Sequence, residues 1–525
     1  MKKLLLLFWM ISIFAIFTMP AECEKLWVDP AAPASMIEKL NWDGAETLFR
    51  GIHHTCEWQM QTENGEVGED NFIKWVYMLV APYSEVKDGI TLGELKSFWK
   101  YGVSVSFNQL AVTAQTRQIL IRIFGAVSPN AEIKELESDQ ILKFSWENKG
   151  TWAIIPFEDA DPRWKVIEID GMSPFTYGFV PDSYILTTSW KMTSVDNKYN
   201  CGKGISEGNF DPEKLTTLTL TGTTAITRQL AYHIETDGID YPIVNIKNTI
   251  ARSDITHISN EVSFTPDCPP AVPLRRDGRF CSAPSYFSIL QALGTDIVEL
   301  TGNHNLDWGT DPYLYSLNLY DKAEIQYYGG GLTEDAAQKP VFIENHGNKI
   351  AFLGCNSMGP DTAWAGNDKP GAAKCDLEKM KKQVTELKAE GWLPVVTFQN
   401  FEYSYYDVPP VESHDFYAVA EAGPVIISGS QAHIPQGMTF VNQTFIHFGL
   451  GNLLFDQMSD VEKNSFFDRH YFYENRYIGN ILETIQLENY SQTRFLTGSE
   501  RSDFLNLIFS TNSWDKTFPN SKNNE

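Results

Sequence analysis

Basic residues are scarce in this chain of 525 residues. Its 42 Lys and Arg are outnumbered by 67 Asp and Glu, and the formal net charge is −25. A chain this acidic lacks the basic face that nucleic acid and anionic membrane surfaces require, so we expect no nucleic-acid partner. The charge is compatible with cation binding. An anionic polymer would need a local positive patch or a bridging metal ion.

Cysteine is also sparse, with seven in the chain, and none of the spacings is typical of a zinc site. Cys268 with Cys281 and Cys355 with Cys375 are the short-loop disulfides we expect, although sequence alone leaves the connectivity open. A Gly-x-Ser-x-Gly nucleophile elbow is missing around Ser428 and Ser430. Its absence argues against serine hydrolysis.

Long apolar runs are missing after the N-terminus. There, Met1-Lys2-Lys3 precedes an apolar run from Leu4 to Met19, which predicts a secretory signal peptide over residues 1–23. Glu22 fits poorly before a lipid-modified Cys23, so plain export is preferred to lipidation, and an uncleaved membrane anchor is the other alternative. We therefore expect an exported protein, extracellular, at the cell surface or periplasmic.

Residues 25–210 are predicted to form an α/β domain. Apolar runs predict strands at 72–82, 151–157 and 164–169. Thr91 with Glu94 three residues on is a capping box that predicts a helix start, and a second helix is expected over 116–124. This domain resembles the periplasmic solute-binding fold, which implies a small solute as ligand. An α/β domain without a ligand is the equal alternative.

A polar stretch, 196–213, is the predicted linker to a second α/β domain over residues 215–460, and 461–525 is a predicted C-terminal extension packed on it. In the second domain the patterns alternate between strand and helix. Strands are predicted at 215–221, 296–301, 326–328, 339–344, 349–355, 393–398 and 425–428, helices at 284–293, 311–322, 377–390 and 416–422, and a hairpin at 437–448.

Polar side chains follow several of these strands. The ends of parallel strands meet at one edge of a sheet, where α/β proteins build their sites. Imidazole, amide and carboxylate groups together suit a divalent cation such as Mn, Fe, Zn or Ni. The side chains are Asn260, Glu261, Asn303, His304, Asp307, Gln399, Glu402, Gln431, His433 and His447.

The order of several motifs is similar to that of the CapA family of capsule and poly-γ-glutamate synthesis proteins, whose domain resembles the calcineurin-like metallophosphatases. The resemblance implies a four-layer α/β/β/α sandwich. The motifs that carry it are Ser-Asn-Glu at 259–261, Thr-Gly-Asn-His-Asn-Leu-Asp-Trp-Gly at 301–309, Gly-Gly-Gly at 329–331, Lys-Ile-Ala-Phe-Leu-Gly at 349–354, Gly-Ser-Gln-Ala-His at 429–433 and Phe-Gly-Leu-Gly-Asn-Leu-Leu-Phe-Asp at 448–456.

Three departures from the family pattern weaken the implied metal site. Thr223 follows Gly222 where the family has a metal-binding Asp. Gln399 stands where the family has a His, ahead of Glu402, and Gln431 replaces the first His of a Ser-His-Pro-His motif. What remains is a set for one ion, Glu261, Asn303, His304 and His433, with Thr223, Asn260, Gln399, Gln431, His447 and Asn452 as further pocket residues.

The resemblance implies a role in capsule or poly-γ-glutamate-type polymer synthesis, anchoring or release, with an extracellular anionic polymer or a cell-wall ligand as partner. One alternative is an active mononuclear metallohydrolase of phosphoesters or amides, with His304, His433, Asp307 and Glu402 as catalytic residues and one Mn, Fe or Zn ion. The other is a metal-free, non-catalytic protein that binds a solute or polymer.

Overall fold

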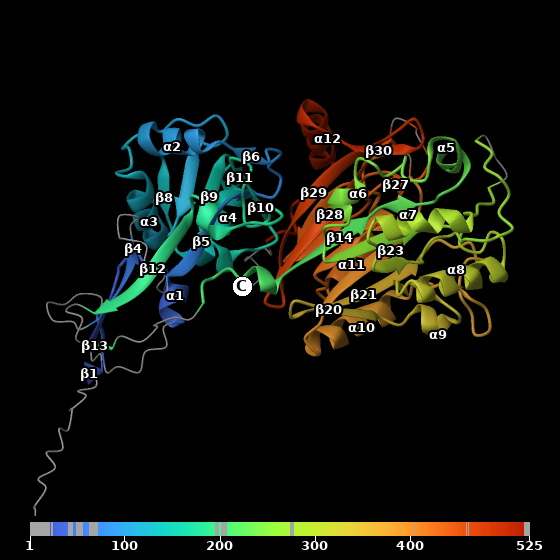
Figure 1. The fold of residues 1–525 in the computed structure, drawn as a ribbon, viewed down its shortest axis with the longest axis horizontal. Helices are drawn as coiled ribbons and strands as arrows, with labels where there is room; N and C mark the ends of the chain where they lie inside the picture. The colour runs from blue at the N-terminus through green and yellow to red at the C-terminus, as the bar shows by residue number, and fades with distance from the viewer. Residues whose placement is uncertain are drawn as a thin grey trace, which may run out of the picture. The chain divides into compact units, whose positions relative to one another are not determined.

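The structure is a computed structural model (Figure 1). It describes residues 21–22, 25–39, 46–48, 56–61, 72–194, 199–200, 207–273, 278–403, 405–457, 459 and 461–518. The predicted signal peptide up to residue 20, Cys23 and part of the predicted linker lie outside these ranges. In the described part of the chain, no helix has the length and apolar character needed to cross a membrane.

The chain divides into two compact units. The first contains Met1–Tyr77, Ala114–Gly125 and Val180–Phe210, and the second contains Met78–Thr113, Ala126–Phe179 and Asp211–Glu525. The predicted domain boundaries at 25–210, 215–460 and 461–525 stay predictions.

In the first unit a mixed sheet has the strand order β3-β2-β4-β12-β5, and β5 contributes its residues up to Tyr77 to this unit. Its strands are β2 (Lys25–Val28), β3 (Glu46–Leu48), β4 (Cys56–Gln61), β12 (Thr187–Ser194) and β5 (Ile73–Pro82). Helix α3 (Ala114–Phe124) confirms the predicted helix, and Arg122 on it pairs with the buried Asp29 at 2.5 Å.

The first part of the second unit is a small α/β layer, in which β7 (Gln109–Val112) lies parallel to both β8 (Ile133–Glu135) and β9 (Thr151–Pro156). Helix α2 (Leu92–Tyr101) begins as predicted, since the Thr91 side chain accepts a hydrogen bond from the Glu94 backbone at 3.1 Å. The capping box is only half formed, because the Glu94 carboxylate accepts hydrogen bonds from Ser104 and Ser106 instead.

The described residues between 211 and 518 form two large sheets and a two-stranded one, β19 (Gly330–Gly331) with β22 (Gly371–Ala372). The first has the order β18-β17-β16-β14-β28-β29-β30, and the second has the order β20-β21-β23-β24-β26-β25 (Figure 1). The first sheet contains β14 (Leu215–Thr221), β16 (Ile255–Asn260), β17 (Ile297–Glu299), β18 (Gln326–Tyr328), β28 (Asn464–Tyr473), β29 (Arg476–Glu488) and β30 (Gln492–Phe495). The second contains β20 (Val341–Asn345), β21 (Asn348–Asn356), β23 (Leu393–Gln399), β24 (Ile426–Ser428), β25 (Met438–Val441) and β26 (Thr444–His447).

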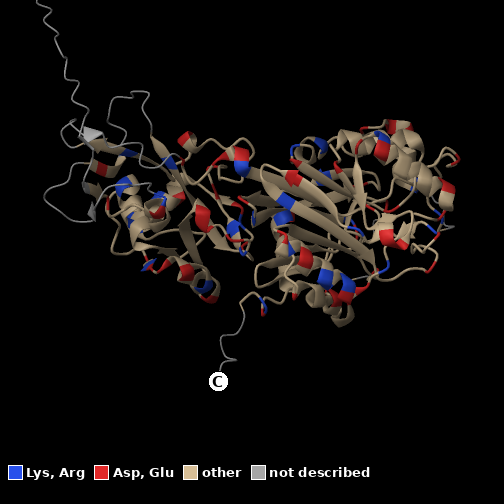
Figure 2. Cartoon of the chain, turned by 90° about the horizontal axis from the view of Figure 1, so that it is seen from below, with Lys and Arg blue, Asp and Glu red and all other residues tan. Residues whose placement is uncertain are grey.

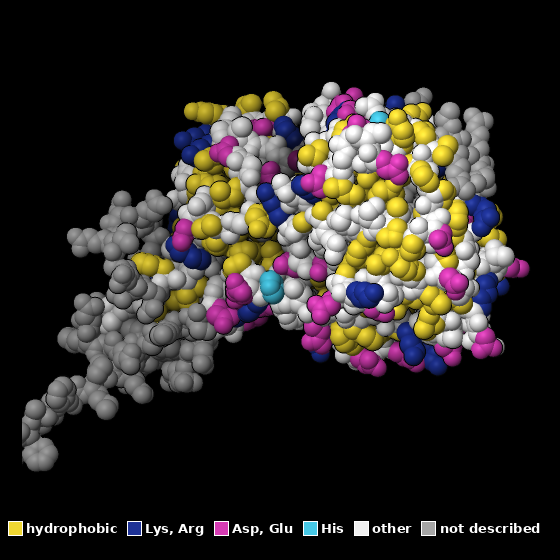
Figure 3. Space-filling view, turned by 45° about the vertical axis from the view of Figure 1, so that its right-hand side comes forward, with side chains coloured by type: hydrophobic (Ala, Val, Ile, Leu, Met, Phe, Trp, Pro, Cys, Tyr) yellow, Lys and Arg dark blue, Asp and Glu magenta, His cyan; other side chains and the backbone are white. Residues whose placement is uncertain are grey.

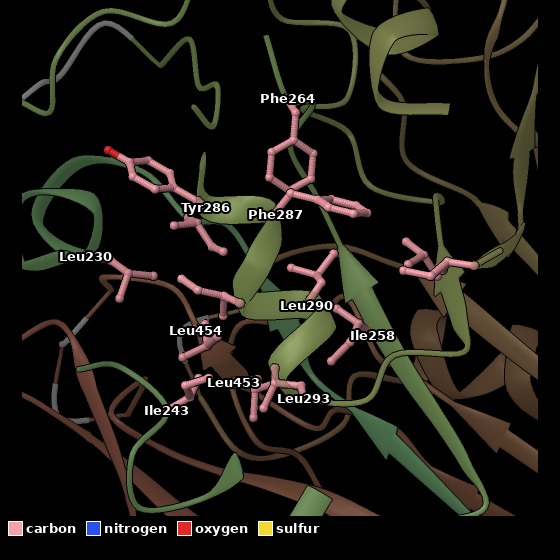
Figure 4. Close-up of a cluster of buried hydrophobic side chains, with 14 of the residues drawn as sticks. Leu230, Ile243, Ile258, Phe264, Tyr286, Phe287, Leu290, Leu293, Leu453 and Leu454 are labelled. Carbon is pink, nitrogen blue, oxygen red and sulfur yellow. The ribbon is translucent and has the colours of Figure 1, made fainter. Parts of the chain in front are cut away.

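Three apolar clusters define the layers. One lies between the two sheets and joins Leu218 and Ile297 of the first to Phe352 and Ile426 of the second. Another packs helices against the first sheet through side chains such as Phe287, Leu290 and Ile258 (Figure 4). The third packs α10 (Leu377–Ala389) and α11 (Pro410–Ala420) against the second sheet. The predicted α/β/β/α sandwich is therefore confirmed.

The C-terminal segment 461–518 belongs to this sandwich. Strand β28 pairs antiparallel with the whole length of β14, from Leu215 opposite Tyr473 to Thr221 opposite Phe467. Strand β29 then pairs with β28, so the segment continues the first sheet beyond β14. It supplies strands of the sheet as well as packing on it.

Most predicted elements of the sandwich are confirmed, including α8 (Thr310–Lys322), α10 and β23. Helix α11 differs, because it begins at Pro410 and ends at Ala420, whereas the sequence pattern predicts 416–422. Proline is favoured in the first turn of a helix, where its missing N–H has no partner to lose. The pair Pro409-Pro410 therefore marks the true start.

Both expected disulfides are present, Cys268–Cys281 and Cys355–Cys375.

Lys and Arg are interspersed with Asp and Glu over the ribbon in Figure 2. On the face in Figure 3, hydrophobic side chains alternate with acidic and basic ones.

Candidate functional site

Glu261 is a fully buried acid directly after β16. Its backbone N–H donates to the carbonyl of Thr224 at 2.9 Å, but neither carboxylate oxygen has a hydrogen-bond partner. Burial raises the pKa of Glu261, although the imidazoles of His433 and His304 oppose the rise. An unpartnered buried carboxylate is costly, so this position favours a cation or a proton.

The loop after β17 lies against Glu261. A Cβ added at Gly302 would come within 2.8 Å of the Glu261 Cα, so only glycine permits this close approach. The next residues, Asn303 and His304, are thereby brought to the buried acid. The amide oxygen of Asn303 is buried and has no hydrogen-bond partner.

His304 pairs with Asp307, with 2.8 Å between Nδ1 and Oδ2. Burial alone would lower the pKa of His304, but the hydrogen bond to Asp307 and the charge of Glu261 outweigh burial and raise it. Asp307 also accepts a hydrogen bond from the backbone N–H of Phe280 at 2.8 Å. The imidazole therefore keeps Nδ1 on Asp307 and has Nε2 left for another partner.

His433 is 2% exposed and is held from both ring nitrogens. Nδ1 lies 2.8 Å from the side-chain oxygen of Asn452, while Nε2 lies 3.1 Å from Glu402 and 3.7 Å from Glu261. Burial alone would lower the pKa of His433, but the two carboxylates outweigh burial and raise it to about 9. The hydrogen bond to His433 in turn lowers the pKa of Glu402.

Neutral side chains stand where the family pattern has metal ligands. Thr223 lies on β15 (Thr223–Thr224), paired with Asn452 on one side and Ser259 on the other. Gln399 ends β23, and its side-chain oxygen has no hydrogen-bond partner. Gln431 is fully buried, and neither end of its amide is bonded. Buried polar groups are normally satisfied, so this concentration of unpartnered atoms indicates a binding site.

Two predicted pocket residues turn away from this cluster. The Asn260 amide donates to the carbonyl of Val262 and to the hydroxyl of Tyr320, which belongs to the helix-side core. His447 pairs with Asp468 at 2.6 Å and stacks edge-on against Phe466 in the core between the sheets. Both side chains serve the packing of the sandwich.

The structure also adds groups that the sequence patterns do not indicate. Arg228 pairs with Asp456, and its guanidinium lies over the rings of Phe280 and Phe455, 4.8 and 5.0 Å from their centroids. Those two rings in turn contact His304 and His433, at 4.6 and 5.1 Å between ring centroids. An isolated Arg before a helical pattern carries no signal for this role.

The side chains at the site include several groups that can ligate a metal ion. Within the described ranges, no group of three or more His, Cys, Asp or Glu is arranged to hold one. However, two ligands of one ion at about 2.1 Å lie roughly 3–4 Å apart, which is the separation of His433 from Glu261 and from Glu402. The buried oxygens of Asn303 and Gln431 have no hydrogen-bond partner, and amide oxygens are of a kind that also binds divalent cations.

This domain is thus a two-sheet α/β/β/α sandwich with imidazole, carboxylate and amide groups at its strand ends. Residues 217–457 match the family described as "Bacterial capsule synthesis protein PGA_cap". Over 186 residues the chain is 25% identical to the "Capsule biosynthesis protein CapA" of Bacillus anthracis, covering 35% of this chain and 45% of that protein. These matches confirm the predicted similarity of residues 217–457 to the CapA family.

Solved structures with a similar arrangement have low sequence identity. The 5'-nucleotidase precursor from Thermus thermophilus is 15% identical with a TM-score of 0.34, covering 56% of this chain and 57% of its own. The ABC-type phosphate transport receptor from Vibrio cholerae is 12% identical with a TM-score of 0.23, covering 27% of this chain and 68% of its own. The chain spans less than half the length of the curated relative that it matches.

Proposed function

We propose that this protein acts outside the cytoplasm in the synthesis, anchoring or release of a capsule polymer of the poly-γ-glutamate type, and that it binds the polymer through one divalent cation. The observation that carries the proposal is the set of buried, unpartnered oxygens on Glu261, Asn303 and Gln431, of which Glu261 lies 3.7 Å from His433. The match to the capsule synthesis family supports the choice of polymer.

Glu261, Asn303, His304 and His433 are the residues that would hold the cation, with Mn, Fe or Zn the ions that suit carboxylate, amide and imidazole ligands. When bound, such an ion supplies Lewis-acid character and positive charge. Asn452 bonds to Nδ1 of His433, and Asp307 bonds to Nδ1 of His304. The Nε2 atom of each imidazole would then be the one that ligates the cation.

The charge of the chain supports a cation-dependent mode of polymer binding. Glu261, Glu402 and Asp307 all lie at the site, and the neighbouring Arg228 is already paired with Asp456. A polymer bearing carboxylates would be repelled by these acids. A divalent ion reverses that repulsion locally, which reconciles an acidic protein with an anionic polymer.

An aromatic strip beside the site supports polymer binding as well. It consists of Phe401, Tyr403 and Tyr405, whose rings contact one another at 6.1 and 5.6 Å between centroids. Phe401 is 52% exposed and Tyr405 is 47% exposed. Phe401 and Tyr403 are the chain neighbours of Glu402, which contacts His433, so the exposed rings are available to a polymer held by an ion at His433.

Hydrolysis is a second candidate, and one observation favours it. The His304 side chain is 22% exposed, and its pairing with Asp307 raises its pKa. A protonated imidazole in such a position can donate a proton to a leaving group. The bond broken would be an amide or a phosphoester.

Calorimetric titration of poly-γ-glutamate oligomers into the full exported chain tests the proposal. We expect binding with added Mn²⁺, loss of binding with EDTA, and no binding of neutral dextran under either condition. Binding that is equally tight in EDTA would contradict the cation-dependent mode. Release of shorter oligomers during incubation would favour the hydrolytic candidate.

A further inference from the structure

A second buried acid adjoins the candidate site. Glu299 is the last residue of β17 and is fully buried. One carboxylate oxygen accepts a hydrogen bond from the Thr301 hydroxyl at 2.6 Å. The other accepts one from the Ser430 hydroxyl and lies 3.5 Å from Nε2 of His257. Thr301, Ser430 and His257 are themselves fully buried.

The two hydroxyls occupy matching places in the chain. Thr301 lies three residues before His304, and Ser430 lies three residues before His433. The loops that present the two imidazoles come from different sheets, since β17 belongs to the first and β24 to the second. Glu299 therefore joins the two loops at matching positions, each three residues before an imidazole. Ser430 lies 131 residues from Glu299 in the chain.

The network reaches the other two strands that carry site residues. His257 is on β16, four residues before Glu261. Its Nε2 lies 3.0 Å from the hydroxyl of Tyr328, and that hydroxyl is 3.0 Å from the hydroxyl of Thr397. Thr397 is on β23, two residues before Gln399. One connected set of side chains thus includes residues of β16, β17 and β23 and of the loop after β24.

The packing around this network leaves no spare room. A Cβ added at Gly354 on β21 would come within 2.7 Å of the Thr397 hydroxyl, 2.9 Å of Thr301 and 3.0 Å of Tyr328. A glycine at this point of β21 therefore lets the second sheet approach the network. A carboxylate held from several sides in such a space has one available position.

We propose that Glu299 is a positioning residue, which fixes the separation of the His304 and His433 imidazoles by tying Thr301 and Ser430 to one carboxylate. This inference rests on the candidate site described above, and it concerns the site's geometry in the absence of any ligand. Supporting groups of this kind orient the residues that touch a ligand.

The charge of Glu299 is maintained by its partners. Burial alone would raise the pKa of Glu299, but His257 and the two hydroxyls outweigh burial and lower it. The carboxylate is thus an acceptor only, and both hydroxyls must donate to it. The hydroxyl hydrogens of Thr301 and Ser430 are therefore committed to Glu299.

The test is NMR of the full chain labelled with ¹⁵N-histidine, without added metal. Signals of His304 and His433 are assigned with the His304→Ala and His433→Ala variants. We expect Ser430→Ala to shift the ring signals of His433 alone, and Thr301→Ala to shift those of His304 alone. Glu299→Gln is expected to shift both. Thr444→Ala is the matched control, because Thr444 is another buried hydroxyl, bonded to the Pro424 carbonyl at 2.6 Å.

A purely structural network would give a different pattern. Ser430→Ala and Thr301→Ala would then lower the unfolding temperature, as Thr444→Ala does, and leave both imidazole signals in place. That result would overturn the proposal. The two hydroxyl variants keep the test decisive if Glu299→Gln does not fold.

A second measurement separates this inference from the proposed function. Mn²⁺ affinity of the three variants is measured by calorimetry, where loss of an orienting partner is expected to weaken binding about 10- to 100-fold. If the unmodified chain binds no Mn²⁺, the proposed function fails. The imidazole signals would still decide the positioning role.

Discussion

Nε2 of His433 lies 3.1 Å from a carboxylate oxygen of Glu402, although His433 is 2% exposed and the Glu402 side chain is 52% exposed. The acid comes from the loop after β23, whereas the imidazole follows β24 in the chain. A surface residue therefore covers one side of a buried imidazole. Glu261, fully buried, faces the same nitrogen at 3.7 Å.

This pairing predicts the effect of Glu402→Gln on His433. Because the hydrogen bond and charge of Glu402 help to raise the pKa of His433 to about 9, their loss should move that pKa back towards its ordinary value of 6.5. The NMR titration of the His433 ring measures the change. Glu421→Gln, an exposed acid elsewhere, should leave the midpoint unchanged, and an unchanged midpoint in Glu402→Gln would contradict the pairing.

Glu412 predicts a gain of stability on substitution. It is 1% exposed on α11, and burial raises its pKa to about 8, despite a 3.1 Å hydrogen bond from Gln436. Its contribution to stability is present below the ordinary pKa of 4.5 and is lost as pH rises through 8. Glu412→Gln should therefore stabilise the fold above pH 8, by roughly 5 kcal/mol. Urea unfolding at pH 5 and pH 9 measures this, and equal stability of the two chains at pH 9 would count against it.

His470 predicts a loss of stability in acid. It is fully buried, and burial lowers its pKa from 6.5 to about 4, against the opposing charge of Asp468. Between those values the unfolded chain binds a proton that the folded chain does not, so stability falls as pH falls from 6.5 towards 4. The loss from this residue is about 3 kcal/mol. In His470→Gln the difference in unfolding free energy between pH 7 and pH 4 should shrink by that amount; an unaltered difference would exclude this role.

The aromatic strip predicts a selective loss of polymer affinity. Removing the rings in Phe401→Ala/Tyr405→Ala should weaken poly-γ-glutamate binding about 30-fold, since each of the two exposed rings contributes on the order of 1 kcal/mol. Mn²⁺ affinity should stay the same, because neither ring bears a ligand atom. Leu507→Ala on α12 (Gly498–Ser510) is the control, as Leu507 is 44% exposed elsewhere. Full polymer affinity in the double variant would show that the aromatic strip does not contribute to polymer binding.

Local sequence predicts the parts of the site that depend on one segment. The apolar run before Gly302 and the polar residues after it indicate a strand that ends in a functional loop, and the structure has β17 at that place. Side chains alternate along a strand, but the pattern does not say which face is which. Asn260 and Glu261 look equally suitable in sequence, yet Asn260 bonds to Tyr320 on the helix side while Glu261 lies beside His433.

Relations between distant segments could not be predicted. Glu299 reads as one polar residue in a short strand, and nothing near it indicates Ser430, which is 131 residues away. The same holds for β28, whose pairing with β14 depends on a register set by the assembled core. Such contacts arise from the packing of two sheets, so they become visible only in the folded chain.

The most direct test of the central claim is the metal content of the full chain, purified without chelators and measured by mass spectrometry after exposure to Mn²⁺ and Zn²⁺. The account predicts about one equivalent of divalent metal in the unmodified chain. It predicts none in His304→Ala/His433→Ala, because this double variant lacks both imidazoles of the proposed ligand set. Absence of metal from the unmodified chain, or retention of one equivalent in the double variant, would contradict it.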